Sequence, residues 1–207
     1  MAQPKQEKKE DEPRPIDAVP PGWDTMCDES KQMLKDTSVV CQIRRSKNDN
    51  RVVYQANLID DPSGSGGKIL NPQEPIKVFW LKIEPSYIAK HRKSGKKDDR
   101  TELTFLESNM AYGISWEVHG DAKKREYKIT FVALKERPAI LKIDPKDNLP
   151  KCFGKVQGKD GKQVEAILTD MYVHTTENWV GLPTVNYIML NGISYETGEK
   201  LQQKIQK

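Results

Sequence analysis

The stretch Pro75-Ile-Lys-Val-Phe-Trp-Leu-Lys-Ile83 decides the fold class of this chain of 207 residues. Both of its alternating faces are mainly apolar, and it is rich in β-branched and aromatic residues, which is typical of a strand covered on both sides. Pro75 stands where the start of a strand tolerates a missing N–H, and Lys77 and Lys82 lie near the ends, where they can reach water. We therefore expect residues 75–83 to form the central strand of a mostly antiparallel β domain.

The strongest hairpin signal lies in residues 112–136. A register that sets Trp116 opposite Ile129 also sets Glu117 opposite Lys128, so that one face is apolar and the other is charged. This register predicts that Trp116 is buried and that the two charged side chains are neighbours on the exposed face.

A second hairpin is predicted within residues 39–59. One of its faces becomes almost entirely apolar if Ile43 lies opposite Tyr54 and Cys41 lies opposite Ala56. A half-buried hairpin requires such a face, and this pattern sets the expected register.

Glycine dipeptides mark two turns nearer the C-terminus. Asp160-Gly161 favours the positive φ of a tight turn, which would bring Val156 close to Val164. Asn191-Gly192 is the best short turn signal in the chain and predicts a last hairpin over residues 185–195. Upstream of both, Asn148-Leu-Pro150 is expected to break the chain between strands.

The strands recur at the spacing of all-β folds. This spacing predicts a mainly β fold: an antiparallel β-sandwich or a partly closed β-barrel of about nine or ten strands, with one or two short helices. Residues 28–35 are expected to form one helix, capped by Asp28, and residues 101–110 another, capped by Thr101.

The composition divides the chain into three parts. Residues 1–37 are expected to be a disordered or extended arm, rich in charge and proline, with the short helix at its end. Residues 38–197 are expected to form a single β-rich domain. Residues 198–207 are predicted to be a polar C-terminal tail with one or two helical turns.

The charge and the cysteines restrict the class of protein. The 34 basic and 30 acidic residues give a net charge of +4, a mixed surface that supports a polyanionic partner only weakly. Cys27, Cys41 and Cys152 follow neither a disulfide framework nor a zinc spacing, which predicts reduced thiols and a cytoplasmic location; one bridge with one free thiol is the alternative. We expect no secretory signal and no transmembrane segment, because no stretch is apolar enough.

The most basic run of the chain spans residues 90–97. Its functional interpretation is an electrostatic footprint for an acidic partner such as RNA or anionic lipid. The alternative, which we favour, is an exposed loop whose lysines keep it soluble, because no aromatic residue interrupts the run and Asp98-Asp99 follow at once. The candidate residues of the run are Lys90, His91, Arg92, Lys93, Lys96 and Lys97.

The sequence predicts neither a catalytic residue, nor a cofactor, nor a metal site. The nucleophile elbow, zinc-protease and dinucleotide motifs are absent from the sequence, and the glycine-rich segment 62–67 lacks the spacing of a phosphate loop. An enzyme of unfamiliar type would have to use Glu117, His119 or His174, whose spacing is a weak metal signal. We expect these histidines to be structural or exposed.

Four short motifs of the chain belong together: Asn50-Arg-Val-Val-Tyr54 with Asn57, Pro75-Ile-Lys-Val-Phe-Trp80, Glu102-Leu103 and Ala111-Tyr112-Gly113. With these motifs the chain resembles an uncharacterised domain family of bacteria and eukaryotes, over roughly residues 38–197. The resemblance implies a single β-rich domain and supplies no catalytic residue.

We predict a non-enzymatic binding or structural β domain, with a small ligand or a protein as partner. Its site would be a cleft between sheets or the mouth of a barrel, where aromatic side chains gather with polar groups at the rim. For each aromatic residue taken singly, plain core packing is the alternative. The candidates are Tyr54, Trp80, Tyr112 and Trp116, with Arg44 and Asn57 at the rim. The other two hypotheses are the adaptor for acidic partners and the unfamiliar enzyme.

Overall fold

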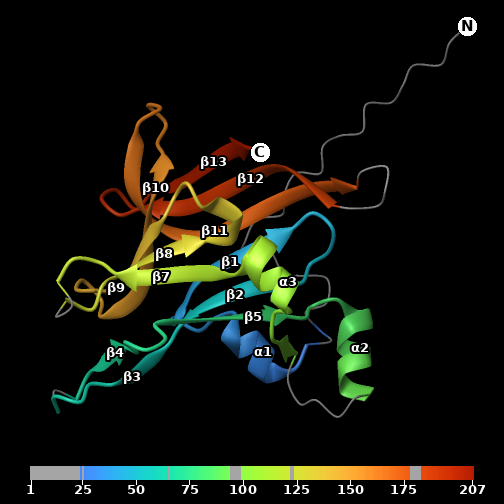
Figure 1. Ribbon diagram of the computed structural model, residues 1–207, viewed down its shortest axis with the longest axis horizontal. Helices are drawn as coiled ribbons and strands as arrows, with labels where there is room; N and C mark the ends of the chain where they lie inside the picture. The colour runs from blue at the N-terminus through green and yellow to red at the C-terminus, as the bar shows by residue number, and fades with distance from the viewer. Residues whose placement is uncertain (1–23, 25, 65, 94–98, 122–123, 178–182) are drawn as a thin grey trace, which may run out of the picture.

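The computed structural model describes residues 24, 26–64, 66–93, 99–121, 124–177 and 183–207, which form a mainly β, sandwich-like fold without a closed barrel (Figure 1). The strands are β1 (Val39–Arg45), β2 (Arg51–Ala56), β3 (Leu58–Asp60), β4 (Lys68–Leu70), β5 (Ile76–Leu81), β6 (Arg100–Thr101), β7 (Ile114–Val118), β8 (Tyr127–Phe131), β9 (Ala139–Asp144), β10 (Leu149–Gln157), β11 (Gln163–Glu177), β12 (Pro183–Ser194) and β13 (Lys200–Gln206). The helical elements are α1 (Asp28–Met33), α2 (Pro85–Lys93), α3 (Phe105–Glu107), the π-helix η2 (Ser108–Tyr112) and the 3₁₀ turn η4 (Val132–Leu134).

An 11-stranded sheet contains all of these strands except β3 and β4, which pair with each other. Its main order is β6-β5-β2-β1-β11-β10-β9-β8-β7, and β12 with β13 extends from the other edge of β11. The sheet is mixed, because β1 runs parallel to β11. The expectation of a mostly antiparallel fold therefore holds for every pair except this one.

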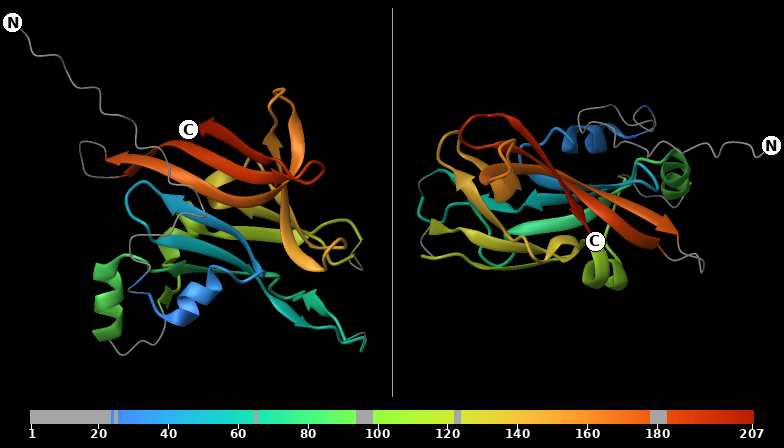
Figure 2. Two further views of the ribbon diagram at one scale, coloured as in Figure 1. Left: turned by 180° about the vertical axis from the view of Figure 1, so that it is seen from behind. Right: turned by 90° about the horizontal axis from the view of Figure 1, so that it is seen from above.

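β11 is the strand at which the sheet divides into two layers. β12 pairs with one edge of β11, while β10 and β1 share the opposite edge. β10 pairs with residues 163–167 of β11, and β1 pairs with residues 170–173, on either side of a register shift between Leu168 and Asp170. From this point β1-β2-β5-β6 and β10-β9-β8-β7 diverge and fold over each other (Figure 2, right).

The main core fills the space between the two layers. Tyr54 of β2 contacts Phe131 of β8 across it, with ring centroids 5.0 Å apart. Each fully buried large side chain contributes about 1.5–3 kcal/mol to folding, so this core dominates the stability of the domain. Other fully buried members are Ile43, Leu70, Ile129, Leu134, Leu141, Met171 and Ile188.

A smaller core covers the outer face of β2 and β5. Leu81 of β5 packs there with Met26, which precedes α1, and with Ile88 of α2. This second core explains why β5 is apolar on both faces, as predicted. The prediction that this strand is central is wrong: β5 lies next to the short edge strand β6, and the centre of the sheet is β11.

The β7–β8 hairpin has the predicted register. Trp116 lies opposite Ile129, and Lys128 pairs with Glu117 across 2.7 Å. The predicted burial of Trp116 is wrong, because β7 is the last strand of its layer and leaves that side chain 37% exposed.

The β1–β2 hairpin has a register two residues away from the predicted one. Cys41 faces Tyr54, and Ile43 faces Val52. The shift of two residues keeps Cys41, Ile43 and Tyr54 on their predicted face, because the side-chain period of a strand is two. A bulge between Val39 and Cys41 accompanies the shift and changes the faces before it: Val40 lies in the main core, and Val39, predicted for that face, packs against the smaller core.

Two turn predictions had different outcomes. Val156 lies opposite Val164, with Gly161 at a φ of +81°, as predicted. Asn191-Gly192 makes no turn, because β12 is continuous through it and a Cβ added at Gly192 would lie 2.9 Å from the carbonyl oxygen of Ile167. That glycine serves close packing of two strands.

The C-terminal segment also differs from its prediction. The chain turns at residues 195–199, where Gly198 has a φ of +72°, and returns as β13, which pairs with β12. Residues 200–206 are therefore a strand, where helical turns were expected. The predicted break at Asn148-Leu-Pro150 lies a little earlier, in the turn between β9 and β10: Asn148 belongs to that turn with a φ of +57°, whereas Leu149 and Pro150 are already in β10.

The helix caps differ from those predicted. α1 begins after Cys27, so Asp28 lies in its first turn, and α3 is capped by Thr104 while Thr101 belongs to β6. The basic run, expected to be a loop, starts inside helix α2. Residues 1–23 of the predicted arm lie outside the described part of the chain, so their disorder stays a prediction.

Candidate functional site

Three of the predicted aromatic residues meet at one place between the layers. Trp80 of β5 contacts Tyr112 of η2 edge to face, with ring centroids 5.1 Å apart. The hydroxyl of Tyr54 donates a hydrogen bond of 2.6 Å to the carbonyl oxygen of Tyr112. Trp80 and Tyr54 are buried, so each also serves the core, as the alternative interpretation stated. Burial raises the pKa of the Tyr54 hydroxyl, which therefore stays a hydrogen-bond donor.

The other three candidates of that prediction lie elsewhere. Trp116 packs against Tyr127, with centroids 5.7 Å apart. Arg44 points to the outer face, where its Nη2 lies 2.7 Å from the buried carboxylate of Asp170. Asn57 donates a hydrogen bond to the carbonyl oxygen of Glu74.

Two cations lie against the indole of Trp80. The guanidinium carbon of Arg45 is 4.6 Å from the ring centroid, and the ammonium of Lys82 is 4.7 Å from it. Both side chains are half-buried, which strengthens such cation–π contacts relative to exposed ones. The alternation of side chains along the strands could have identified these two cations. Arg45 continues the inward face of Cys41 and Ile43, and Lys82 continues that of Trp80.

A single carboxylate belongs to this cluster. Glu107 accepts a hydrogen bond of 3.0 Å from the indole N–H of Trp80. The amide and hydroxyl of Thr104 donate to its other oxygen, each at 2.9 Å. Burial acts to raise the pKa of Glu107, but the hydrogen bonds from Thr104 and Trp80, with the charge of Lys82, lower it below its usual value. Glu107 is thus ionised and tethered.

The cluster, defined as Arg45, Lys82, Glu107 and Trp80, carries more positive than negative charge. Among the described residues, no carboxylate forms an ion pair with Arg45 or Lys82. Arg45 donates to Asn48 at 2.9 Å and to the Tyr112 hydroxyl at 3.4 Å, and its buried Nε has no acceptor. Burial lowers the pKa of the Lys82 ammonium, and Arg45 adds to this effect against the opposing charge of Glu107.

The residues of the enzyme hypothesis do not form a comparable group. Glu117 and His119 lie exposed at the edge strand β7, where Glu117 pairs with Lys128. His174 stacks on Tyr187 of β12, with centroids 4.6 Å apart. Within the described ranges, no three potential metal ligands come together.

The basic run is only partly described. Lys90 and Lys93 are exposed on α2, which also carries His91 and Arg92, while Lys96 and Lys97 fall outside the described residues. Tyr87 of the same helix lies 4.9 Å from the ammonium of Lys82, so α2 adjoins the Trp80 cluster.

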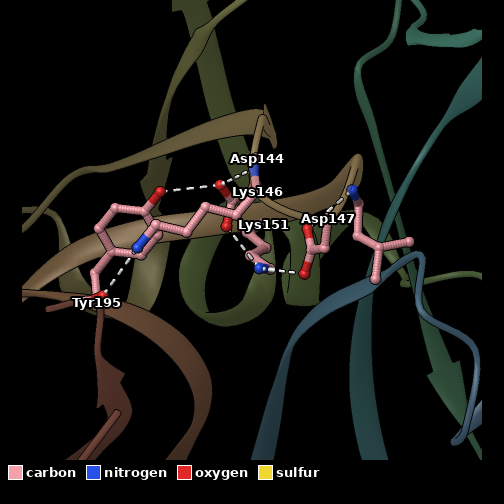
Figure 3. Close-up of polar contacts among 6 residues, drawn as sticks. Asp144, Lys146, Asp147, Lys151 and Tyr195 are labelled. Carbon is pink, nitrogen blue, oxygen red and sulfur yellow. Dashed lines mark hydrogen bonds and ion pairs between the residues drawn. The ribbon is translucent and has the colours of Figure 1, made fainter. Parts of the chain in front are cut away.

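A second charged cluster ties the β9–β10 turn to the turn after β12 (Figure 3). The ammonium of Lys151 lies 2.6 Å from both Asp144 and Asp147. Asp144 also accepts hydrogen bonds from the amide of Lys146 and the hydroxyl of Tyr195. Every charge here has a partner, so the cluster holds two turns together.

An open hollow of about 500 Å³ lies on the outer face of the β9–β11 layer, beside Phe153 and Glu165. Its Arg137 already donates to Gln203 at 2.7 Å. Neither of the two buried side-chain donors without an acceptor among the described residues, the Nε of Arg45 and the Nδ2 of Asn50, lies in this hollow.

Comparison with known proteins assigns the chain to a family but to no characterised relative. No curated protein and no solved structure is significantly similar to the chain. No helix in the described part of the chain has the length and apolarity that a membrane crossing needs. Residues 42–204 match the family described as Domain of unknown function (DUF4833), and the chain belongs to that family.

Proposed function

We propose that this domain is a non-enzymatic binding module, and that the Trp80 cluster holds an anionic group of its ligand. The observation that supports this most is the pair of half-buried cations, Arg45 and Lys82, which lie 4.6 Å and 4.7 Å from the Trp80 ring and form no ion pair with a carboxylate among the described residues. The Nε of Arg45 is in addition a buried donor without an acceptor, which costs about 1–3 kcal/mol; the Nδ2 of Asn50 is another such donor.

The ligand chemistry follows from the donors. A guanidinium forms paired hydrogen bonds with phosphate or carboxylate oxygens, and the ammonium of Lys82 supplies a point charge beside it. Glu107 offsets part of this positive charge, but its oxygens accept hydrogen bonds from Thr104 and Trp80, and it forms no ion pair with either cation. Two cations against one carboxylate leave the Trp80 cluster with a net positive charge.

The same carboxylate argues for binding in preference to catalysis. A general base works best when its pKa is near the operating pH. The pKa of Glu107 is lowered, so this group is a weak base. Lys82 and Arg45 then serve as binding charges.

The test is a titration with inorganic phosphate, followed through the indole N–H resonance of Trp80 and assigned with Trp80→Phe. We expect a saturable shift that Arg45→Ala and Lys82→Ala each weaken by roughly tenfold. Lys77→Ala is the matched control, since Lys77 is exposed on the same strand. Equal shifts in all variants, or the same shift with sodium chloride, would contradict the proposal.

A further inference from the structure

Three large apolar side chains protrude from one turn of the chain. Phe105 is 80% exposed, Leu106 is 65% exposed and Met110 is 76% exposed. They lie on α3 and η2, which follow each other without a break. We name Phe105, Leu106 and Met110 the apolar turn.

The apolar turn is held in a fixed shape. Thr104 and Glu107 form a reciprocal capping box, and the side chain of Asn109 donates to the carbonyl of Phe105 at 2.8 Å. A Cβ added at Gly113 would lie 2.0 Å from the carbonyl oxygen of Ser108, so only glycine permits this close return of the chain. The carbonyl of Gly113 then accepts from the amide of Val132, which anchors the turn to the β8 layer. These contacts hold the side chains outward, where they contribute nothing to the core.

Cations lie on one side of the apolar turn. Glu107, the carboxylate within it, points to Trp80, against which Arg45 and Lys82 lie. Beyond Lys82 is helix α2, whose Lys90 and Lys93 are exposed and whose Tyr87 is 43% exposed. Glu102 is the exposed carboxylate of residues 99–112, because Asp99 is buried and accepts from the amide of Cys27.

We infer that the apolar turn docks on the surface of an anionic lipid bilayer. Phe105, Leu106 and Met110 enter the boundary between headgroups and acyl chains, and the cations of α2 meet the headgroups. This inference rests on the proposed function in one respect: Arg45 and Lys82 would hold a lipid phosphate. The protruding shape and the cations on one side of it favour a bilayer over a protein groove, because an anionic interface accepts apolar side chains that insert beside cationic ones.

The test is co-sedimentation with vesicles of phosphatidylcholine, with and without phosphatidylserine. We expect binding only to the vesicles that contain phosphatidylserine, and loss of roughly tenfold or more in the double variant Phe105→Ala with Leu106→Ala. Val118→Ala is the matched control, because Val118 is an apolar side chain that is 48% exposed on β7. It should bind as the wild type does.

Three results would overturn the inference: no binding of the wild type, equal binding to both kinds of vesicle, or equal binding of the double variant. A wild-type dimer that the double variant converts to a monomer would assign the apolar turn to a second copy of the chain instead.

The phosphate titration separates the two proposals, because the double variant leaves Arg45 and Lys82 in place. If it binds phosphate normally and loses vesicles, both proposals stand. If Arg45→Ala loses phosphate binding but keeps vesicle binding, Arg45 does not hold a lipid phosphate. That result would overturn this part of the inference and leave the insertion of the apolar turn in place.

Discussion

The two charged clusters of this domain are built in opposite ways. Around Asp144, two carboxylates enclose one ammonium, and Tyr195 and a backbone amide complete the hydrogen bonds (Figure 3). Around Trp80, two cations share one carboxylate, which accepts hydrogen bonds from Trp80 and Thr104 and forms no ion pair with them. The first arrangement satisfies itself, whereas the second, in the function we propose, is completed by an anion from outside. Residual charge, rather than the number of charged groups, separates a structural cluster from a binding site.

The pKa shifts follow the same division. Burial acts to raise the pKa of Asp144, but hydrogen bonds from Lys151, Lys146 and Tyr195 lower it overall. Burial acts to lower the pKa of Lys151, but Asp144 and Asp147 raise it. Folding therefore favours both charges of that pair, whereas the lowered pKa of Lys82 means that folding disfavours its charge.

The largest effect is expected from Asp144→Ala. The substitution leaves the half-buried Lys151 with only Asp147 and removes the acceptor of Tyr195, which should lower the free energy of unfolding by about 2 kcal/mol. Urea denaturation measures this. Phosphate binding, measured where the variant is folded, should stay unchanged; a joint loss of both would show that the two clusters are coupled.

A smaller effect, of opposite kind, is expected from Glu107→Gln. Glutamine can keep the capping bond from Thr104 with its one carbonyl oxygen, but its NH2 group then faces the indole N–H of Trp80 and cannot accept from it. The substitution also removes the one negative charge of the Trp80 cluster. Phosphate affinity should rise by about fivefold, or about 1 kcal/mol, while stability changes less than in Asp144→Ala. Calorimetric titration at low salt measures the affinity, and weaker binding would show that Glu107 orients the cations.

The smallest effect concerns pH. The lowered pKa of Asp144 contributes stability that is present above the ordinary carboxyl value of about 3.9 and is lost as the pH falls through the lowered value. The raised pKa of Lys151 contributes stability below about 10.4 that is lost as the pH rises through the raised value. Asp144→Asn should flatten both flanks of a plot of melting temperature against pH. Unchanged flanks would place the responsible groups elsewhere.

The sequence predicted the face of the sheet on which a side chain lies better than it predicted which strands are neighbours and in which register. Alternation placed Trp116, Ile129 and Glu117 on the correct faces, yet it carries no information on which strand ends a layer, and so the exposure of Trp116 was missed. The β1–β2 register failed by two residues for the same reason, since such a slip preserves both faces. Asn191-Gly192 is locally a turn signal, but contact with Ile167 decided its conformation.

The site was half predictable. Aromatic residues in strands pointed to Tyr54, Trp80 and Tyr112, which do meet. Arg44 was chosen in place of Arg45, although Arg45 has the parity of the inward face, and Glu107 comes from a helix whose docking onto β5 no local pattern encodes.

The division of the sheet at β11 has a consequence for the growing chain. Both layers depend on one strand that leaves the ribosome after β1 to β10, and β1 must find residues 170–173 of it in parallel. Until then β1 and β2 exist as a hairpin with an unpaired edge and an uncovered apolar face, a state that invites association with other chains. The closing pairing also has a high contact order, which slows folding. We therefore expect ribosome-bound chains that end before β11 to be protease-sensitive, and the domain to close only once β11 and its partner β12 have emerged.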